Sequence, residues 1–397
     1  MANVSSSNGL EKRPRLSFQQ ADGSYFPNWT SASLGSIILP YSEKVYGEHS
    51  YEVLTSSREG LQRQSDHFAT EQRHDTDGYN VIPFGYCTYR NRSDDGKFTF
   101  NMNKISENGI VSKFYPVFSF ENANSEFMIE YLNSSENIKK KLSVLAVGTS
   151  QVVLSFEALK KAQFPIPCKA EQDRIAALLE CINRRIVAQS KIVDSLKKYK
   201  RGLLTYAFEE MTLSDDADST TYHFSEIAQR RKEKYSPDSG VEYPCIELEH
   251  IEQGTGRLLG SVSSTTQSSI KTVARSGDVL FGKLRPYLRK FAFAEQNIVC
   301  SSEIWAFVPS EYVIPKYLYY LVQTEHFLRV ANISSGTKMP RAEWANIEKE
   351  PFDIPCILIQ EKTVSILEAI DKKICTSGDS LRMLMNFREG LLQQLFI

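Results

Sequence analysis

Two stretches of the chain repeat apolar residues at alternating steps of four and three positions, which is the spacing of a heptad seam. Each stretch follows a proline, Pro167 or Pro355, and predicts one helix of about 35 residues, roughly 50 Å long at 1.5 Å per residue. The predicted seam consists of Ile175, Leu179, Ile182, Ile186, Val193, Leu196 and Leu203 in the first stretch and of Leu367, Ile370, Ile374, Leu381, Leu384 and Leu391 in the second.

The two stretches are copies of each other. Residues 148–208 align with residues 336–396 at a constant offset of 188, without a gap over 61 positions. Polar residues interrupt both seams at matching places, where Gln189 matches Ser377 and Lys200 matches Arg388. Polar residues in a seam can fix its register at a cost in stability. The chain is therefore a tandem duplication with an internal pseudo-twofold repeat.

A long helix with one apolar stripe needs a partner, and the other copy is the obvious one. The chain between the copies must return across a whole domain, which allows an antiparallel pair. We expect an intramolecular antiparallel coiled coil. The alternative is that each amphipathic helix packs only onto its own domain.

The segments before each copy match only weakly and indicate mixed helix and strand. We predict strands at 37–39, 79–89, 97–102, 115–120, 270–273, 278–281 and 298–307, and closing helices at 126–141 and 315–330. The fold class is α+β, with two α/β domains separated by the two long helices. The predicted boundaries are 15–165 for the first domain, 166–211 for the first helical spacer, 212–351 for the second domain and 352–397 for the second spacer. Residues 209–220, with five acids and no base, form an acidic linker.

The composition excludes several classes of protein. Hydrophobic residues are 41% and charged residues 24%, which is ordinary for a globular chain. The seven cysteines form no C-x-x-C pair and the six histidines show no metal-ligand spacing, so we expect no metal site and a reducing cytoplasm. We find no secretory signal in residues 1–10 and no run of about 18 apolar residues, so we expect a cytoplasmic protein that does not contact membranes.

The net charge of −1 hides local excesses of base. Residues 281–290 (FGKLRPYLRK) carry four bases and no acid, and residues 169–201 carry nine bases and four acids. Bases interleaved with aromatic side chains suit contacts with phosphates and base edges, although a solvated basic strand edge is the alternative. The candidate DNA-binding residues are Arg90, Arg92 and Lys97 in the first variable segment and Arg230, Lys232, Lys283, Arg285, Tyr287, Arg289, Lys290, Lys338 and Arg341 in the second.

Signatures of catalysis are missing from the sequence. It contains no G-x-x-x-x-G-K-[ST] phosphate loop and no N-P-P-[YF] or D-P-P-Y tetrad. Residues 254–256 (GTG) lack the third glycine of a dinucleotide motif, so they indicate a turn. We expect a chain without catalytic residues and without a cofactor of its own.

These features resemble the specificity (S) subunit, HsdS, of type I restriction–modification systems. Residues 167–172 (PCKAEQ) and 200–208 (KRGLLTYAF) are similar to that family's conserved regions. The second copy, at 355–360 and 388–396, has Ile359 in the place of Glu171. Residues 277–302 and 109–118 resemble strand patterns of the family's target-recognition domains, and residues 13–16 before Trp29 resemble its N-terminal entry.

The resemblance implies a non-catalytic subunit that reads a bipartite, asymmetric site in double-stranded DNA. Each variable segment would read one half-site, and the helices would hold the halves about one DNA turn apart, near 34 Å. Two methyltransferase (M) subunits and motor-nuclease (R) subunits would join it, with S-adenosylmethionine, ATP and Mg²⁺ in those partners. The alternatives are a coiled-coil scaffold that binds proteins and an orphan recognition module of a fused methyltransferase–nuclease.

Overall fold

The computed structural model describes residues 14–67, 75–149, 151–210, 219–333 and 339–396. Contacts within the chain divide it into two units, which we describe separately. Unit 1 contains residues 1–188 and 381–397, and unit 2 contains residues 189–380. Each unit therefore includes one variable segment, the first half of the long helix that follows it and the second half of the other long helix.

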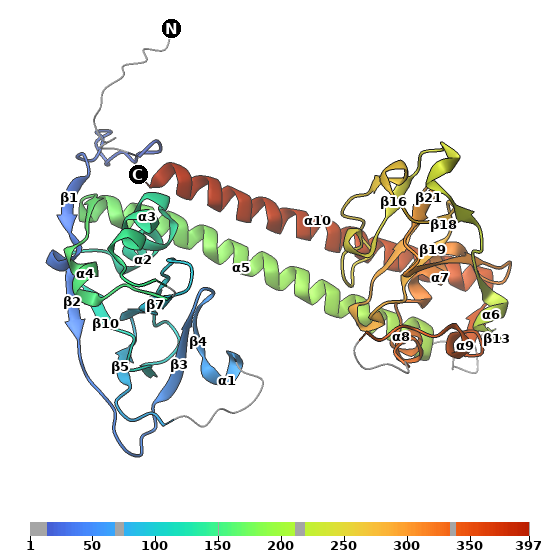
Figure 1. The fold of residues 1–397 in the computed structure, drawn as a ribbon, viewed down its shortest axis with the longest axis horizontal. Helices are drawn as coiled ribbons and strands as arrows, with labels where there is room; N and C mark the ends of the chain where they lie inside the picture. Colours follow the sequence, from blue (N-terminus) through green and yellow to red (C-terminus); the bar gives the residue numbers. More distant parts are fainter. Residues whose placement is uncertain (1–13, 68–74, 150, 211–218, 334–338, 397) are drawn as a thin grey trace, which may run out of the picture. The chain divides into compact units, whose positions relative to one another are not determined.

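Unit 1 is built on two four-stranded sheets. The antiparallel sheet has the order β2 (Ile38–Tyr41), β10 (Val117–Phe120), β6 (Cys87–Tyr89) and β8 (Phe100–Met102). The other sheet has the order β4 (Gly60–Arg63), β3 (Glu52–Ser57), β9 (Asn108–Val111) and β5 (Asn80–Pro83), with β3 and β9 parallel. Two strand pairs, β1 (Thr30–Ser33) with β12 (Gln163–Ile166) and β7 (Arg92–Ser93) with β11 (Val152–Val153), complete it. The short helices are η1 (Leu34–Ser36), α1 (Gln64–His67), α2 (Ser125–Ser134), α3 (Glu136–Leu145) and α4 (Phe156–Lys161) (Figure 1).

Unit 2 repeats this plan. Its antiparallel sheet has the order β14 (Ala228–Arg230), β22 (Ile304–Pro309), β19 (Val279–Gly282) and β20 (Phe291–Phe293). Its second sheet has the order β15 (Lys234–Tyr235), β18 (Lys271–Ala274), β21 (Ile298–Cys300), β16 (Pro244–Ile246) and β17 (Val262–Ser263), with β16 and β21 parallel. Strand β13 (Ser219–His223) pairs with β23 (Pro351–Pro355), as β1 pairs with β12 in unit 1. The short helices are α6 (Phe224–Ile227), η3 (Pro237–Ser239), η4 (Leu248–His250), η5 (Ser264–Thr266), η6 (Pro286–Leu288), α7 (Pro315–Leu321), α8 (Glu325–Ala331) and α9 (Trp344–Ile347).

The predicted helices at 126–141 and 315–330 are each two helices, so the prediction of single helices is wrong. Helix α2 gives way to α3 at Ser135, and α7 gives way to α8 close to Thr324. Each of these residues is an N-cap, because the Ser135 side chain accepts a hydrogen bond from the Ile138 amide and Thr324 accepts one from Phe327. Hydroxyl caps favour a new helix start, and the apolar periodicity alone does not reveal them.

The two long helices are α5 (Lys169–Thr205), which ends in a π-helical turn at Tyr206–Glu210, and α10 (Ile357–Leu395). In unit 1, Asn183 of α5 contacts Arg388 of α10, and in unit 2, Lys200 of α5 contacts Asp371 of α10. Within unit 2, Gln189 of α5 also contacts Ser377 of α10, so a rising number on one helix meets a falling number on the other and the pair is antiparallel, as predicted. No helix among the described residues is long and apolar enough to cross a membrane.

All thirteen predicted seam residues are buried or half-buried. Residues of both long helices also belong to the core of each domain. Ile175 and Leu179 of α5 and Leu395 of α10 lie in the main core of unit 1, and Leu204 and Leu367 lie in that of unit 2. The coiled coil and the packing of each helix on its own domain therefore occur together.

Candidate nucleic-acid interface

The basic segment 281–290 forms the connection between strands β19 and β20 in unit 2. Strand β19 ends at Gly282, where a side chain would meet Leu248 and Lys290, and the turn η6 follows at Pro286. Arg285 and Arg289, on either side of η6, adopt positive φ angles of 52° and 50°. Few residues other than glycine adopt this left-handed conformation, so the surrounding contacts must hold the loop.

Residues 340–342 supply those contacts through their backbone. The Arg285 amide donates to the Pro340 carbonyl at 2.8 Å, the Ala342 amide donates to the Lys283 carbonyl at 2.8 Å, and Leu284 forms a β-bridge with Arg341. The Arg341 guanidinium binds the Glu303 carboxylate at 3.1 Å. Arg341, which is 56 residues from Arg285 in the sequence, therefore lies beside the segment that carries Lys283 and Arg285.

The basic residues of this segment divide into two groups. Lys290 donates to the Leu248 carbonyl at 2.6 Å, and Arg289 binds Glu325 at 2.8 Å, so both side chains help to hold the loop. Within the described part of the chain, neither an ion pair nor a side-chain hydrogen bond is recorded for Lys283, Arg285 or Tyr287. Arg285 is exposed and Tyr287 is 53% exposed, so these side chains are available to a ligand.

Arg230 lies against two tryptophans that were not among the predicted DNA-binding residues. Its guanidinium is 4.6 Å from the ring centroid of Trp344 and 5.7 Å from that of Trp305. These cation–π contacts hold the exposed arginine in place. Trp305 lies in the strand predicted at 298–307 and Trp344 lies in α9, for which no element was predicted, so only the fold brings them to Arg230.

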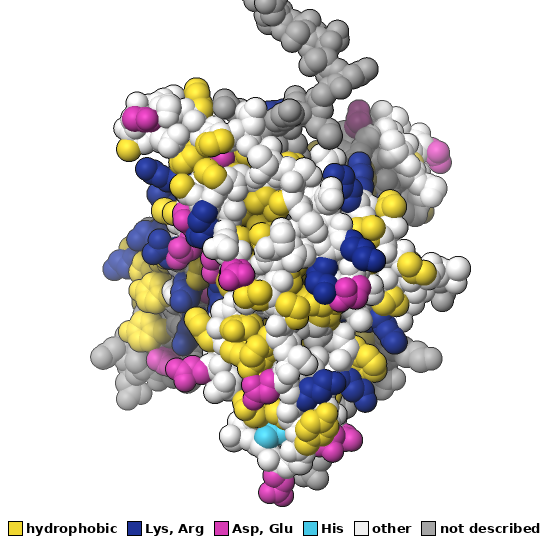
Figure 2. Space-filling model, turned by 90° about the vertical axis from the view of Figure 1, so that its left-hand side faces the viewer, with side chains coloured by type: hydrophobic (Ala, Val, Ile, Leu, Met, Phe, Trp, Pro, Cys, Tyr) yellow, Lys and Arg dark blue, Asp and Glu magenta, His cyan; other side chains and the backbone are white. Residues whose placement is uncertain are grey.

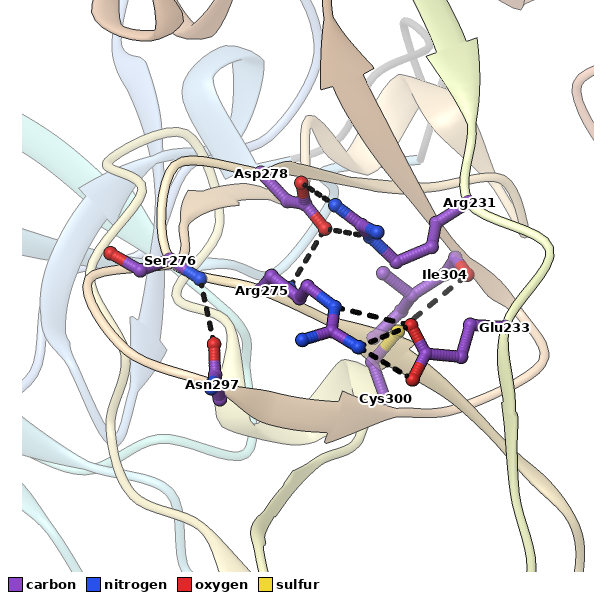
Figure 3. A network of polar contacts seen from close by, with 8 residues as sticks. All are labelled: Arg231, Glu233, Arg275, Ser276, Asp278, Asn297, Cys300 and Ile304. Atoms are coloured by element: carbon purple, nitrogen blue, oxygen red, sulfur yellow. Dashed lines mark hydrogen bonds and ion pairs between the residues drawn. The ribbon is translucent and has the colours of Figure 1, made fainter.

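The alternation of side chains along β14 and the residues after it separates structural from exposed bases. Arg231 binds Asp278, which is 2% exposed, through both carboxylate oxygens, and Arg275 binds Glu233 (Figure 3). The hydrogen bond with Asp278 is the main cause that raises the pKa of Arg231. Its neighbours Arg230 and Lys232 are exposed, as expected for positions that face the other way. Arg230 and Lys232, which were predicted to bind DNA, are therefore exposed, whereas Arg231 between them is held by Asp278.

In unit 1 one candidate, Arg92, lies near the exposed Phe114. The guanidinium of Arg92 is 5.2 Å from the ring centroid of Phe114, and Lys113 contacts the same ring at 5.7 Å. Arg90 and Lys97 are exposed. Figure 2 shows that Lys and Arg side chains on this unit form separate groups with hydrophobic side chains between them. Lys113 and Phe114 were missed because Arg92 meets them only in the fold.

The acids that oppose these bases in the sequence have other partners. Asp95 accepts hydrogen bonds from the Ser93 hydroxyl and from the Lys97 amide, and it binds Arg58 at 2.7 Å. These contacts, with the Ser93 bond as the largest cause, lower the pKa of Asp95 to about 2. Asp94 accepts from Gln151. Asp95 is therefore paired with Arg58, and no ion pair joins it to Arg90 or Arg92 among the described residues.

Two further residues named from the sequence are Lys338 and Glu171. Lys338 lies outside the described residues. Glu171, for which the second copy has Ile359, is 3% exposed, and its carboxylate accepts a hydrogen bond from the Trp29 indole at 3.2 Å. Glu171 thus joins the N-terminal entry to the start of α5. Among the described residues no cluster of three or more His, Cys, Asp or Glu could hold a metal ion.

The chain is similar in sequence to specificity subunits of type I restriction enzymes and similar in fold to a solved S subunit. The chain is 25% identical to the HindI type I restriction enzyme specificity subunit of Haemophilus influenzae over 32% of its own length and 29% of that subunit's. It is 21% identical to the MjaIX specificity subunit of Methanocaldococcus jannaschii over 79% of this chain and 77% of that one. The matched part thus spans less than a third of the HindI subunit. The fold resembles the type I restriction–modification S subunit of M. genitalium, with a TM-score of 0.60, 14% identity and coverage of 97% of this chain and 99% of that one.

The chain also matches a family model, described as the type I restriction modification DNA specificity domain. The family model matches residues 35–201 and again residues 220–379, which together make up more than half of the chain. Each match contains one variable segment and most of the long helix after it. The chain therefore belongs to the family of type I restriction modification DNA specificity domains.

Proposed function

We propose that this protein is the DNA specificity subunit of a type I restriction–modification complex, in which each unit reads one half of a bipartite, asymmetric site in double-stranded DNA. The observation that carries the proposal is the doubled match to a DNA specificity domain on two units of the same topology. Two different variable segments on one repeated plan are what an asymmetric, two-part site requires. Relatives that are named specificity subunits support a role in recognition and not in catalysis.

The exposed basic and aromatic groups support the proposed DNA contact. In unit 2 these are Arg285 and Tyr287 on the η6 loop and Arg230 on its tryptophans, with the half-buried Lys283 beside them. Arginine bonds phosphates and reads guanine through two parallel hydrogen bonds, so an arginine held in a rigid loop can both position and specify. We retain the domain boundaries 15–165, 166–211, 212–351 and 352–397 as part of this proposal.

The proposed complex contains two methyltransferase subunits on the pseudo-twofold helical pair and motor-nuclease subunits beyond them. S-adenosylmethionine, ATP and Mg²⁺ act in those partners, because catalytic signatures were not found in this sequence. The complex works in the cytoplasm, where its DNA substrate is. A modest net charge of −1 fits a subunit that needs its partners for tight binding.

The test is sequencing of the methylated bases of the host genome with and without this gene. We expect one bipartite motif, with an unspecified spacer of fixed length, to lose its methylation when the gene is deleted and to regain it when the gene is restored. If every methylated motif persists after deletion, the proposal is wrong. As the control, deletion of the methyltransferase gene should remove the same motif.

A second measurement separates this function from that of a protein-binding scaffold. The affinity of the assembled methyltransferase complex for its motif should fall steeply as salt is raised, because binding releases counterions from phosphates. A scaffold predicts no such salt-dependent binding of DNA. A flat response would favour the scaffold.

A further inference from the structure

The apolar seam is interrupted in unit 1 by a polar network of three elements. Arg388 of α10 donates to both carboxylate oxygens of Glu130 in α2, at 2.7 Å each, and to the Asn183 side chain of α5 at 2.5 Å. Glu130 and Arg388 are 22% and 27% exposed. The network therefore ties the recognition domain to both long helices in a partly desolvated place.

Unit 2 has the corresponding network. The Lys200 ammonium of α5 lies 2.7 Å from the Asp371 carboxylate of α10 and donates to the Gln323 side chain at 2.8 Å. The Tyr320 hydroxyl of α7 also donates to Asp371, at 2.9 Å. Lys200 is 8% exposed, and burial is the main cause that lowers its pKa, against the opposing effect of Asp371.

The sequence repeat relates the long-helix residues of the two networks, whereas Glu130 and Gln323 occupy different positions of the recognition domains. The offset of 188 places Lys200 on Arg388 and Asn183 on Asp371. The recognition-domain helices also correspond, because buried Gln172 accepts from the amide of Asn124, just before α2, and its repeat partner Gln360 accepts from the amide of Ile314, just before α7. The two networks are thus equivalent contacts between a recognition domain and the two long helices.

The two versions carry the same charges on different elements. Each has one cation from the far end of the opposite helix, one carboxylate and one amide, and unit 2 adds the Tyr320 hydroxyl. In unit 1 the carboxylate is on the recognition domain (Glu130) and the amide is on the long helix (Asn183). In unit 2 the amide is on the recognition domain (Gln323) and the carboxylate is on the long helix (Asp371).

We propose that this exchange of carboxylate and amide is a docking key, which makes each recognition domain fit only the helix that follows it in the chain. The interchangeable module is then the recognition domain together with the first four turns of its helix, through Asn183 or Asp371. The cation at the end of the other helix fits either module, because each supplies one carboxylate. This inference concerns assembly of the chain and goes beyond the proposed function.

Mismatched combinations show why the key discriminates. Glu130 beside Asp371 would place two carboxylates around the single ammonium of Lys200. Gln323 beside Asn183 would leave the guanidinium of Arg388 without a carboxylate. Both arrangements hold an uncompensated charge in a partly buried place, which is costly, and such penalties for wrong partners give specificity.

The test is a double-mutant cycle in the full chain, with Glu130→Gln, Asn183→Asp and the pair together. Each single change upsets the charge balance, so we expect each to lower the Tm by roughly 3–8 °C. The double variant reproduces the arrangement of unit 2 and should return to within about 2 °C of the parent. Glu126→Gln, on the same helix in an exposed pair with Lys104, is the control and should change the Tm little.

The same cycle applies to unit 2 with Gln323→Glu, Asp371→Asn and the pair. Rescue in both cycles supports the key. Additive losses in the double variants, or single changes that leave the Tm unaltered, would overturn it. The measurement is thermal unfolding without DNA, so its outcome is independent of the methylation test of the proposed function.

Discussion

Arg285 illustrates how a single side chain is presented by contacts around its backbone. Its left-handed conformation, at φ 52°, is held by the hydrogen bond of its amide to Pro340 and by the turn at Pro286. The guanidinium itself is exposed and belongs to no recorded ion pair among the described residues. A fixed backbone with an available charged end costs little entropy on binding, which favours a specific contact.

We expect Arg285→Ala to weaken binding of the assembled complex to its motif by about ten- to a hundredfold, or ~1–3 kcal/mol. The measurement is a binding titration at several salt concentrations. Arg275→Ala is the matched control, because Arg275 is already bound by Glu233, and it should change affinity by less than about threefold. Equal effects of the two changes would contradict a specific role for Arg285.

Asp278 gives a prediction about stability at the same scale. It is 2% exposed, binds Arg231 through both oxygens and also accepts from the Arg275 amide at 2.8 Å. Asp278→Ala should lower the free energy of unfolding by ~3–5 kcal/mol, because it leaves a partly buried guanidinium unpaired. Glu233→Ala removes the exposed neighbouring pair and should cost only ~0–1 kcal/mol. Chemical denaturation of both variants checks this, and comparable losses would contradict the argument from burial.

At the scale of elements, the polar positions of the seam set the register of the two long helices. Gln189 of α5 donates to the backbone carbonyl of Ser377 in α10 at 3.0 Å, so the pair that the repeat relates also meets in space. Such polar contacts between apolar layers disfavour slipped pairings, which would leave the polar groups unsatisfied.

We expect insertion of one heptad into each long helix, after Gln189 and after Ser377, to preserve the seam. Seven residues add about 10.5 Å, or roughly three base pairs at 3.4 Å each, to the unspecified spacer of the recognised site. Methylome sequencing of a strain with the variant measures this. Four added residues per helix, about one turn, add about 6 Å with a local unwinding of the pair and should lengthen the spacer by roughly two base pairs. A variant with seven added residues and the original spacer would contradict the role of the helices as a ruler.

At the scale of the whole molecule, two segments with little sequence similarity adopt the same plan. Each unit has an antiparallel four-stranded sheet, a sheet with one parallel pair and a strand pair that leads into the long helix. Loops between conserved strands can change without loss of the core, which lets such a domain acquire a new specificity.

This modularity predicts that exchange of residues 15–147 for the corresponding segment of a relative with another specificity alters one half-site only, provided that the segment also carries a carboxylate at the position of Glu130. The half read by unit 2 and the spacer length should stay the same. The methylated motifs of the two strains, compared side by side, give the answer. Changes in both halves would contradict independent recognition by the two units.

The sequence by itself determined the parts of this protein that depend on local periodicity. The heptad spacing identified both long helices, their thirteen seam residues and the matching polar breaks, because a helix buries whichever stripe recurs every three or four residues. Short β-branched runs located fewer than half of the strands in the described residues, and the runs predicted at 79–89 and 298–307 are each two strands in different sheets. The apolar pattern also did not reveal the helix starts at Ser135 and Thr324.

Only the tertiary structure decided which charges are free and which are used. Adjacent residues such as Arg230 and Arg231 make different contacts. Arg230 lies over the Trp344 ring, and Arg231 binds buried Asp278. Arg388 meets Glu130 across more than half of the chain. A charge interacts with whatever the fold places within a few ångströms, and that distance is unrelated to separation along the sequence.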